Sequence, residues 1–249
     1  MSQAILPIGV RKVFAQTCSS TNTALKNMLL NENLEQGTVY YTNYQTAGRG
    51  QMENKWQSND GQNVLMSIYL KPVFLNADEQ SYLNMIVSLA VKDAAQQLVQ
   101  PNVYIKWPND IIAENLKLGG ILVENVLQKN KVKYCIAGIG LNVNQTDFGI
   151  LNATSLKLLT GQIYQPLEVI EIICKALEKY YLWLNQKQFE KILEAYTVNL
   201  YAKDVERIFK IENKTVKGKI MGVNKNGRLY VMINEEIKSF ANKEIELIY

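Results

Sequence analysis

Four polar clusters between Tyr44 and Asn144 constrain the fold of this chain most, because each follows or lies within a run of residues typical of a β-strand. They occupy residues 45–51, 106–110, 117–120 and 138–142. Each alone would be an ordinary turn, but together they supply two glycine-rich backbone surfaces, three cations and a carboxylate. We therefore expect a β-sheet whose strands gather groups suited to holding a nucleotide triphosphate beside a carboxylate.

The composition limits the chemistry that these clusters can perform. The 249 residues include no histidine, which excludes Ser-His-Asp and Cys-His triads, histidine metal sites and histidine proton shuttles. The three cysteines, Cys18, Cys135 and Cys174, are unevenly spaced, so reduced thiols are expected rather than disulfides or a zinc site. Any chemistry must therefore use Lys, Arg, Asp or Glu side chains, backbone amides and a carboxylate-bound metal ion.

Charge and hydropathy indicate the compartment. The net charge of +4 comes from 27 Lys and Arg against 23 Asp and Glu, without a dense basic block, and is too small to predict nucleic acid as the main partner. The N-terminus lacks the pattern of a secretory signal. No apolar stretch approaches the roughly 20 residues that span a bilayer. We therefore expect a soluble, cytoplasmic protein that does not bind membranes.

Periodicity divides the chain into two parts. Strands are predicted at residues 11–16, 38–44, 64–70, 103–106, 117–127 and 132–143, and helices at 19–29, 81–99, 167–184 and 189–200. From Asp204 onward the alternation of apolar residues predicts five short strands, and Asn226-Gly227 indicates a type I′ hairpin. We therefore expect a catalytic domain at residues 1–202 and a small β-barrel at residues 203–249, which assists catalysis without forming the pocket.

The first cluster ends in Gly48-Arg49-Gly50-Gln51. Its glycines allow close backbone approach to a ligand, and Arg49 can grip a carboxylate or phosphate with two N–H groups. Alone, this tetrapeptide is more often a surface turn with a solvated arginine. Trp56 follows a polar stretch, where an indole can stack on a purine, although large aromatic residues more often belong to the core.

The string at residues 106–110, Lys-Trp-Pro-Asn-Asp, is the most specific of the four. Asn109 and Asp110 can coordinate magnesium through amide and carboxylate oxygens, and the plain alternative is a Pro-Asn-Asp turn. Lys106 and Lys117 favour the functional interpretation, because a lysine beside two glycines can reach a bound carboxylate and an α-phosphate. The plain alternative for Lys117 is a lysine that extends from a cleft into water.

The pattern Gly138-x-Gly140-x-Asn142 is superficially similar to a dinucleotide-binding fingerprint. It lacks the third glycine and lies inside a predicted strand, so a Rossmann site is excluded by its context. Glycine within a strand instead indicates close approach of a ligand to the backbone.

With these motifs in this order, the chain resembles the biotin protein ligases (biotin–[acetyl-CoA-carboxylase] ligases). The motifs are Ser20-Thr21-Asn22, Gln45-x-x-Gly48-Arg49-Gly50, the string at 106–110, Lys117-x-Gly119-Gly120-Ile121-Leu122-Val123-Glu124, Gly138-x-Gly140-x-Asn142 and the C-terminal small barrel. The resemblance implies an α+β fold: a mixed β-sheet flanked by helices, related to class II aminoacyl-tRNA synthetases, followed by an SH3-like β-barrel. It matches the type without an N-terminal DNA-binding domain.

The resemblance also implies an activity. Biotin and ATP react to biotinyl-5′-AMP with release of pyrophosphate, with Mg²⁺ as cofactor, and biotin is then transferred to a lysine of a biotin carboxyl carrier protein or domain of a biotin-dependent carboxylase. It allows a homodimer. Two alternatives remain open: a lipoate–protein ligase of the same fold, and a non-catalytic biotin-binding module.

Residue roles follow from the resemblance by position. Biotin binding is assigned to Ser20, Thr21, Asn22, Gln45, Gly48, Arg49, Lys117, Gly119, Gly120 and Gly138. ATP binding is assigned to Arg49, Gly50, Gln51, Trp56, Lys106, Asn109, Asp110, Lys117 and Asn142, with Trp56 stacking on adenine. Catalysis is assigned to Lys117, Arg49, Lys106 and Asp110, and the magnesium ion to Asn109 and Asp110.

Overall fold

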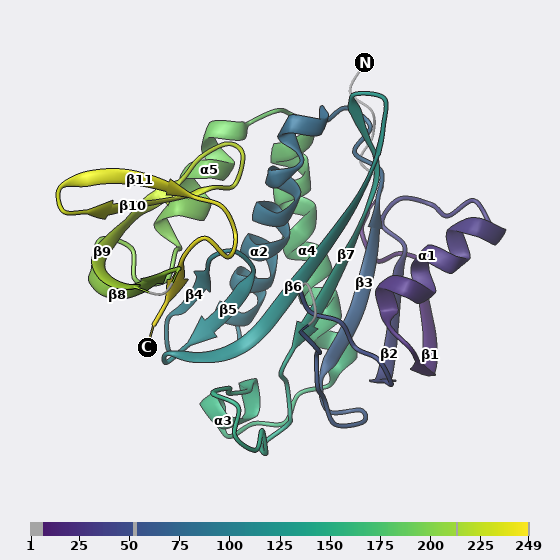
Figure 1. The fold of residues 1–249 in the computed structure, drawn as a ribbon. Coiled ribbons are helices and arrows are strands. Elements are labelled where there is room, and N and C mark those ends of the chain that lie inside the picture. Colours follow the sequence, from purple (N-terminus) through teal and green to yellow (C-terminus); the bar gives the residue numbers. More distant parts are fainter. Residues whose placement is uncertain (1–6, 52–53, 213, 249) are drawn as a thin grey trace.

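The computed structural model describes residues 7–51, 54–212 and 214–248. Its main sheet has seven strands in the order β1-β2-β3-β7-β6-β5-β4 (Figure 1). They are β1 (Lys12–Cys18), β2 (Val39–Gln45), β3 (Val64–Leu70), β4 (Val103–Lys106), β5 (Asp110–Ala113), β6 (Leu116–Gln128) and β7 (Lys131–Leu141). β1 and β2 are parallel and the other neighbours antiparallel, which confirms the mixed sheet.

Helices cover both faces of this sheet. They are α1 (Thr21–Asn31), α2 (Ser81–Gln96), α3 (Leu156–Thr160), α4 (Pro166–Asn185) and α5 (Phe189–Val198), with a short 3-10 turn at η1 (Ala77–Glu79). Neighbouring strand residues point to opposite faces, so Val39 joins the large core with α2 and α4 while Tyr40 joins a small core with α1 and its Leu25. None of these helices, within the residues described, combines the length and apolar character that crossing a membrane requires.

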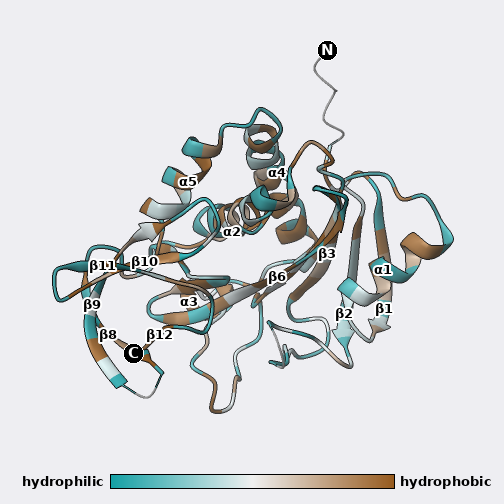
Figure 2. Cartoon of the chain, turned by 45° about the horizontal axis from the view of Figure 1, so that its top comes forward, coloured by the Kyte–Doolittle hydropathy of each residue, from teal (hydrophilic) through white to brown (hydrophobic). Residues whose placement is uncertain are grey.

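β3 lies in the middle of the sheet and is buried along its whole length. The strand was predicted at these seven residues, and a largely apolar run suits a strand with both faces covered. Figure 2 colours most of β3 as apolar. Its one serine, Ser67, is fully buried and therefore needs hydrogen-bond partners inside the protein.

β5 is the strand that the sequence did not predict. It pairs with β4 in a tight hairpin, in which Lys106 lies opposite Asp110. Asp110 therefore opens a strand instead of following one, because the turn at residues 107–109 reverses the chain at once. β5 then pairs with β6 and places Asp110 opposite Gly120.

The C-terminal residues form a separate antiparallel sheet of five strands in the order β11-β10-β9-β8-β12, which confirms the predicted short strands. They are β8 (Glu206–Ile211), β9 (Lys214–Val223), β10 (Leu229–Ile233), β11 (Glu236–Phe240) and β12 (Glu246–Leu247). The predicted type I′ turn is wrong, because it requires positive φ at both Asn226 and Gly227, and only Gly227 has it, at 76°. The longer loop at residues 224–228 makes the reversal without that strain.

The C-terminal sheet packs beside α5 and the β4–β5 hairpin (Figure 1). The indole N–H of Trp107 donates to the carbonyl oxygen of Gly227 over 2.9 Å, and the Ser81 hydroxyl donates to the carbonyl of Lys225. The amide of Asn242 donates to the side-chain oxygen of Gln51 over 2.7 Å. These contacts hold the small sheet against the strand ends that carry the polar clusters. We propose the division at residue 203 as the domain boundary.

Candidate functional site

A cavity of about 390 Å³ lies where the main sheet faces the C-terminal sheet, and residues of all four polar clusters line it. The predicted site residues in its wall are Ser20, Thr21, Asn22, Gln45, Arg49, Gly50, Gln51, Trp56, Lys106, Asn109, Asp110, Lys117, Gly120 and Gly138. Gly140 lines it as well. The structure thus brings together residues up to 118 positions apart that the sequence analysis selected from separate motifs.

Asn142, Gly48 and Gly119 do not line the cavity. Asn142 is buried, and its amide donates to the carbonyl of Thr154 over 2.9 Å, so its assignment to the nucleotide stays a prediction. Gly48 and Gly119 serve backbone packing, because a Cβ there would lie 2.5 Å from the Trp56 carbonyl oxygen and 2.9 Å from the Gly140 carbonyl oxygen, respectively.

Gly120 of β6 and Gly138 and Gly140 of β7 form a surface, the glycine floor, against which the side chains of Trp56 and Asn22 pack. A Cβ on Gly140 would be 2.5 Å from Cε2 of the Trp56 indole, and one on Gly120 would be 3.1 Å from its Cζ3. A Cβ on Gly138 would be 2.5 Å from Oδ1 of Asn22. The sequence predicted close approach of a ligand to these glycines, and in this structure the side chains of Trp56 and Asn22 approach them. The glycines fix the plane of the Trp56 indole.

Three charged residues from adjacent strands gather beside that floor. Nζ of Lys117 lies 2.7 Å from Oδ1 of Asp110 and 5.9 Å from the centre of the Trp56 ring. Lys106 faces the same pair, and burial lowers its pKa, a shift that Asp110 and Glu246 oppose and Lys117 reinforces. The cluster thus holds two cations with one carboxylate, which suits it to a polyanionic ligand.

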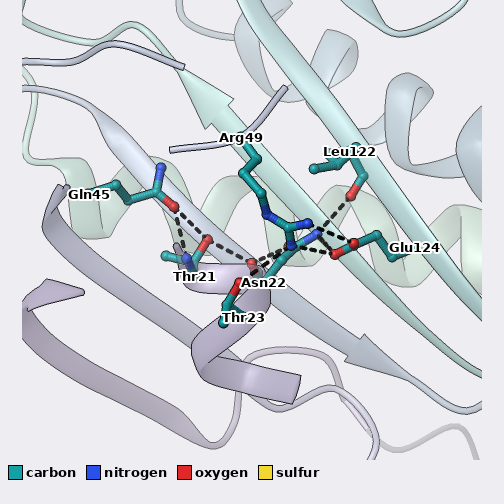
Figure 3. Close-up of polar contacts among 8 residues, drawn as sticks. Thr21, Asn22, Thr23, Gln45, Arg49, Leu122 and Glu124 are labelled. Carbon is teal, nitrogen blue, oxygen red and sulfur yellow. Dashed lines mark hydrogen bonds and ion pairs between the residues drawn. The ribbon is translucent and has the colours of Figure 1, made fainter. Parts of the chain in front are cut away.

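A polar wall at the start of α1 forms the other end of the cavity. The backbone N–H of Thr21 donates to the side-chain oxygen of Gln45 over 2.8 Å (Figure 3). The hydroxyl of Ser67 lies 2.7 Å from the Thr21 hydroxyl and 2.6 Å from Oδ1 of Asn22. Sequence reasoning did not select Ser67, although a hydroxyl inside a fully apolar strand was the available signal.

Glu124 on β6 is a second residue that the site assignment missed, although it ends one of the quoted motifs. Its two oxygens accept from Nη1 and Nη2 of Arg49 over 3.2 and 3.1 Å, and Nδ2 of Asn22 donates to it over 2.7 Å. Figure 3 shows Arg49 meeting Glu124, with Asn22 and Thr23 beside the pair. Arg49 is thereby fixed at the cavity wall by a forked ion pair.

The C-terminal sheet contributes a third side of the cavity. Its lining residues, with the preceding Tyr201, are Phe209, Ile220, Leu229, Asn242, Lys243, Ile245, Glu246 and Leu247. The expectation that this region would not form the pocket is therefore wrong. No local motif marks these residues, because their position depends on how the two sheets pack.

Comparisons with known proteins agree with this geometry. Residues 13–142 match the model of the biotin/lipoate A/B protein ligase family. Over 248 residues the chain is 32% identical to the bifunctional ligase/repressor BirA of Bacillus subtilis, covering 96% of this chain and 75% of that protein. It is 32% identical over 136 residues to the biotin–[acetyl-CoA-carboxylase] ligase of Mycobacterium tuberculosis, covering 53% and 49% of the two chains.

Among solved structures, the chain is similar to the biotin protein ligase of Aquifex aeolicus in complex with biotin and ATP. The TM-score is 0.80 at 26% identity, with 96% of this chain and 99% of that chain covered. The fold implied by the motifs is thereby confirmed over both sheets. On the match to the family and the identity to its members, this chain belongs to the biotin/lipoate A/B protein ligase family.

Proposed function

We propose that this protein is an ATP-dependent biotin–protein ligase, which forms biotinyl-5′-AMP and transfers biotin to a lysine of a carrier domain. The observation that carries the proposal is the placement of Lys106, Asp110 and Lys117 on three adjacent strands, in one cavity with the polar wall of α1. One end of the cavity is suited to phosphates, and the other to a neutral polar ring. Relatives named as biotin ligases support the choice of substrate.

In the first step a carboxylate oxygen of biotin forms a bond to the α-phosphorus of ATP. The bond from that phosphorus to the bridging oxygen breaks, and pyrophosphate leaves with the electron pair. Both reactants are anions, so their approach is unfavourable without nearby cations. Lys117, Lys106 and Arg49 line the cavity and offset this repulsion and the charge that develops at phosphorus.

In the second step the amine of the acceptor lysine attacks the carbonyl carbon of the adenylate, AMP leaves, and the nitrogen loses a proton. Asp110 is the carboxylate in the cavity wall that we assign to receive this proton. Its Oδ1 is held by Lys117, so the second oxygen is the one available for that role. The acceptor belongs to a biotin carboxyl carrier protein or domain.

Asp110 and Asn109 are the residues that we propose to hold Mg²⁺ with the phosphates. The amide nitrogen of Asn109 donates to the carbonyl of Ile121 over 2.8 Å, which leaves its oxygen as a ligand atom. Within the described residues no group of three or more acidic or thiol side chains could hold a metal alone. This fits Mg²⁺, which takes one or two protein oxygens together with phosphates and water, and which supplies charge neutralisation there.

The test is pyrophosphate release from ATP with biotin or with lipoate, followed by labelling of a purified biotin carboxyl carrier domain. Release that depends on biotin, with biotin appearing on the carrier lysine, is expected. Release with lipoate alone would assign the other substrate of the family, and biotin binding without release would make the protein a binding module. We also propose a cytoplasmic location and a homodimer from the resemblance, and light scattering measures the latter.

A further inference from the structure

We propose that Glu124 is a positioning residue for biotin binding, which holds Arg49 at the cavity wall and, together with the Leu122 carbonyl, sets the direction of the hydrogen bonds along the polar wall. This inference rests on the proposed function. Glu124 itself does not line the cavity, whereas both of its partners, Arg49 and Asn22, do. It therefore acts on a ligand through other residues.

The direction of the hydrogen bonds follows from two groups that can only accept, the Glu124 carboxylate and the Leu122 carbonyl. Asn22 must present Nδ2 to both, over 2.7 and 3.3 Å, and Oδ1 to Ser67, over 2.6 Å. The single proton of the Ser67 hydroxyl then goes to Asn22. The oxygen of Ser67 then accepts the proton of the Thr21 hydroxyl, 2.7 Å away, in preference to the longer contact of that hydroxyl with the Gln45 oxygen, 3.2 Å away.

The same sequence of contacts reaches Gln45. The backbone N–H of Thr21 can only donate, so the oxygen of the Gln45 amide faces Thr21 over 2.8 Å. The two N–H donors of that amide point away from Thr21. Glu124 and the Leu122 carbonyl, at one end, and the Thr21 backbone, at the other, thus fix the donors and acceptors that the polar wall presents to biotin (Figure 3).

Glu124 also determines where the guanidinium of Arg49 lies. The forked pair takes one hydrogen from each terminal nitrogen, and Thr23 takes a second from Nη2 over 3.4 Å. An arginine has five N–H hydrogens. In Arg49, the hydrogen on Nε and the second hydrogen on Nη1 have no partner in the described part of the chain. Arg49 can therefore contact a ligand while it remains paired with Glu124.

Replacing Glu124 by Gln keeps the shape and removes the charge. A glutamine amide has one acceptor oxygen and one donor group, while Arg49 and Asn22 both offer donors. The Leu122 carbonyl, which accepts from Nδ2 of Asn22 over 3.3 Å, opposes a turn of the Asn22 amide, so Arg49 is the residue that loses its fixed position. Because hydrogen bonds to charged groups are worth more than neutral ones, we expect biotin to bind about tenfold more weakly, or worse.

The experiment measures the Kd of biotin by calorimetry for the wild type, Glu124→Gln and Glu124→Asp. The aspartate keeps the charge but is one methylene shorter, so its Kd should lie between the other two. Glu32→Gln is the matched control, because the Arg11–Glu32 ion pair does not line the cavity and is similarly exposed. Its side chains are 39% and 40% exposed, against 45% and 33% for Arg49 and Glu124. Its Kd should equal that of the wild type.

A double-mutant cycle separates positioning from general stability. In an Arg49→Ala background, Glu124→Gln should weaken biotin binding less than it does in the wild type, because part of its action passes through Arg49. Additive effects, or a Kd for Glu124→Gln within twofold of the wild type, would overturn the inference.

If the wild type fails to bind biotin, the proposed function is wrong, and the positioning role is then decided by crystal structures of unliganded wild type and Glu124→Gln. The role predicts that the Arg49 guanidinium moves from the wall in Glu124→Gln. An Arg49 guanidinium in the same position in both structures would refute it independently of any ligand.

Discussion

The main-sheet side of the cavity and its C-terminal side are built differently. On the main-sheet side, the functional groups are held by one another: Lys117 by Asp110, and Arg49 by Glu124. The C-terminal side presents mostly apolar side chains, with Asn242, Lys243 and Glu246 among them. The two sides are joined by few hydrogen bonds, such as those of Trp107 with Gly227 and of Asn242 with Gln51.

Chemistry and enclosure therefore come from different sheets. Groups that must be placed within a fraction of an ångström lie on paired strands with partners behind them. Enclosure only requires shape and the exclusion of water, so apolar side chains suffice. Substitutions on the main-sheet side should therefore cost far more activity than those on the C-terminal side, and the following predictions rank them in that order.

The largest effect is expected for Lys117→Ala. It removes a cation from the place where charge develops and leaves Asp110 without its 2.7 Å partner. Loss of one such contact lowers kcat by about 100- to 1,000-fold. The rate of pyrophosphate release measures this, with urea unfolding as the check on the fold. Lys12→Ala is the matched control, because Lys12 pairs with Glu171 and does not line the cavity. Near-normal release by Lys117→Ala would remove Lys117 from catalysis.

Gly140→Ala should have the next largest effect. The new methyl group would lie 2.5 Å from the Trp56 indole, so the indole must leave the glycine floor. Overpacking of this kind costs about 1–3 kcal/mol, equivalent to roughly 5- to 150-fold in the KM for ATP. A shift of tryptophan fluorescence should accompany it. In a Trp56→Ala background the methyl group meets no indole, and a loss of equal size there would show that the floor serves the ligand directly.

The alkaline limb of the pH profile tests Lys106. Burial lowers its pKa, so it loses its proton at a lower pH than an ordinary lysine, near 10.4, and kcat/KM for ATP should fall earlier as pH rises. At pH values between the pKa of Lys106 in the folded protein and its pKa in the unfolded chain, the unfolded chain binds more protons. The free energy of unfolding therefore rises with pH in that range. Lys106→Arg should move the limb upward, because arginine stays protonated. An unchanged limb would assign it to another group.

Sequence periodicity predicted the elements whose burial is simple. Both ends of β3 were predicted correctly, because its apolar residues are covered on both faces of the sheet. β5 was missed, because it is four residues long and follows a turn that already had a functional interpretation. Asn142 was assigned from its motif, and the structure places it just beyond the strand that carries the motif's glycines. β7 ends at Leu141, so the alternation that turns Gly138 and Gly140 toward the cavity does not extend to Asn142.

The site was predictable where its residues lie in short motifs and not elsewhere. Lys106 and Asp110 are four positions apart and were assigned together. Ser67 and Glu124 both contact Asn22, which lies 45 and 102 positions from them, respectively. A pattern within a short stretch of sequence does not show such a distant partner. The C-terminal side depends on sheet packing, which sequence periodicity does not contain. Such contacts come only from the folded arrangement.

The smallest effect is expected for Asn242→Ala, which breaks the 2.7 Å contact with Gln51 between the two sides. Both residues are near the surface, where one neutral hydrogen bond contributes about 0.5–1.5 kcal/mol. If the C-terminal side only encloses the ligand, the KM for ATP should rise about twofold to tenfold while kcat for pyrophosphate release stays unchanged. Asn102→Ala, just before β4 and outside the cavity wall, controls for removal of a surface amide. A large fall in kcat for Asn242→Ala would show instead that the C-terminal sheet positions reacting groups, and the distinction between the two sides would not hold.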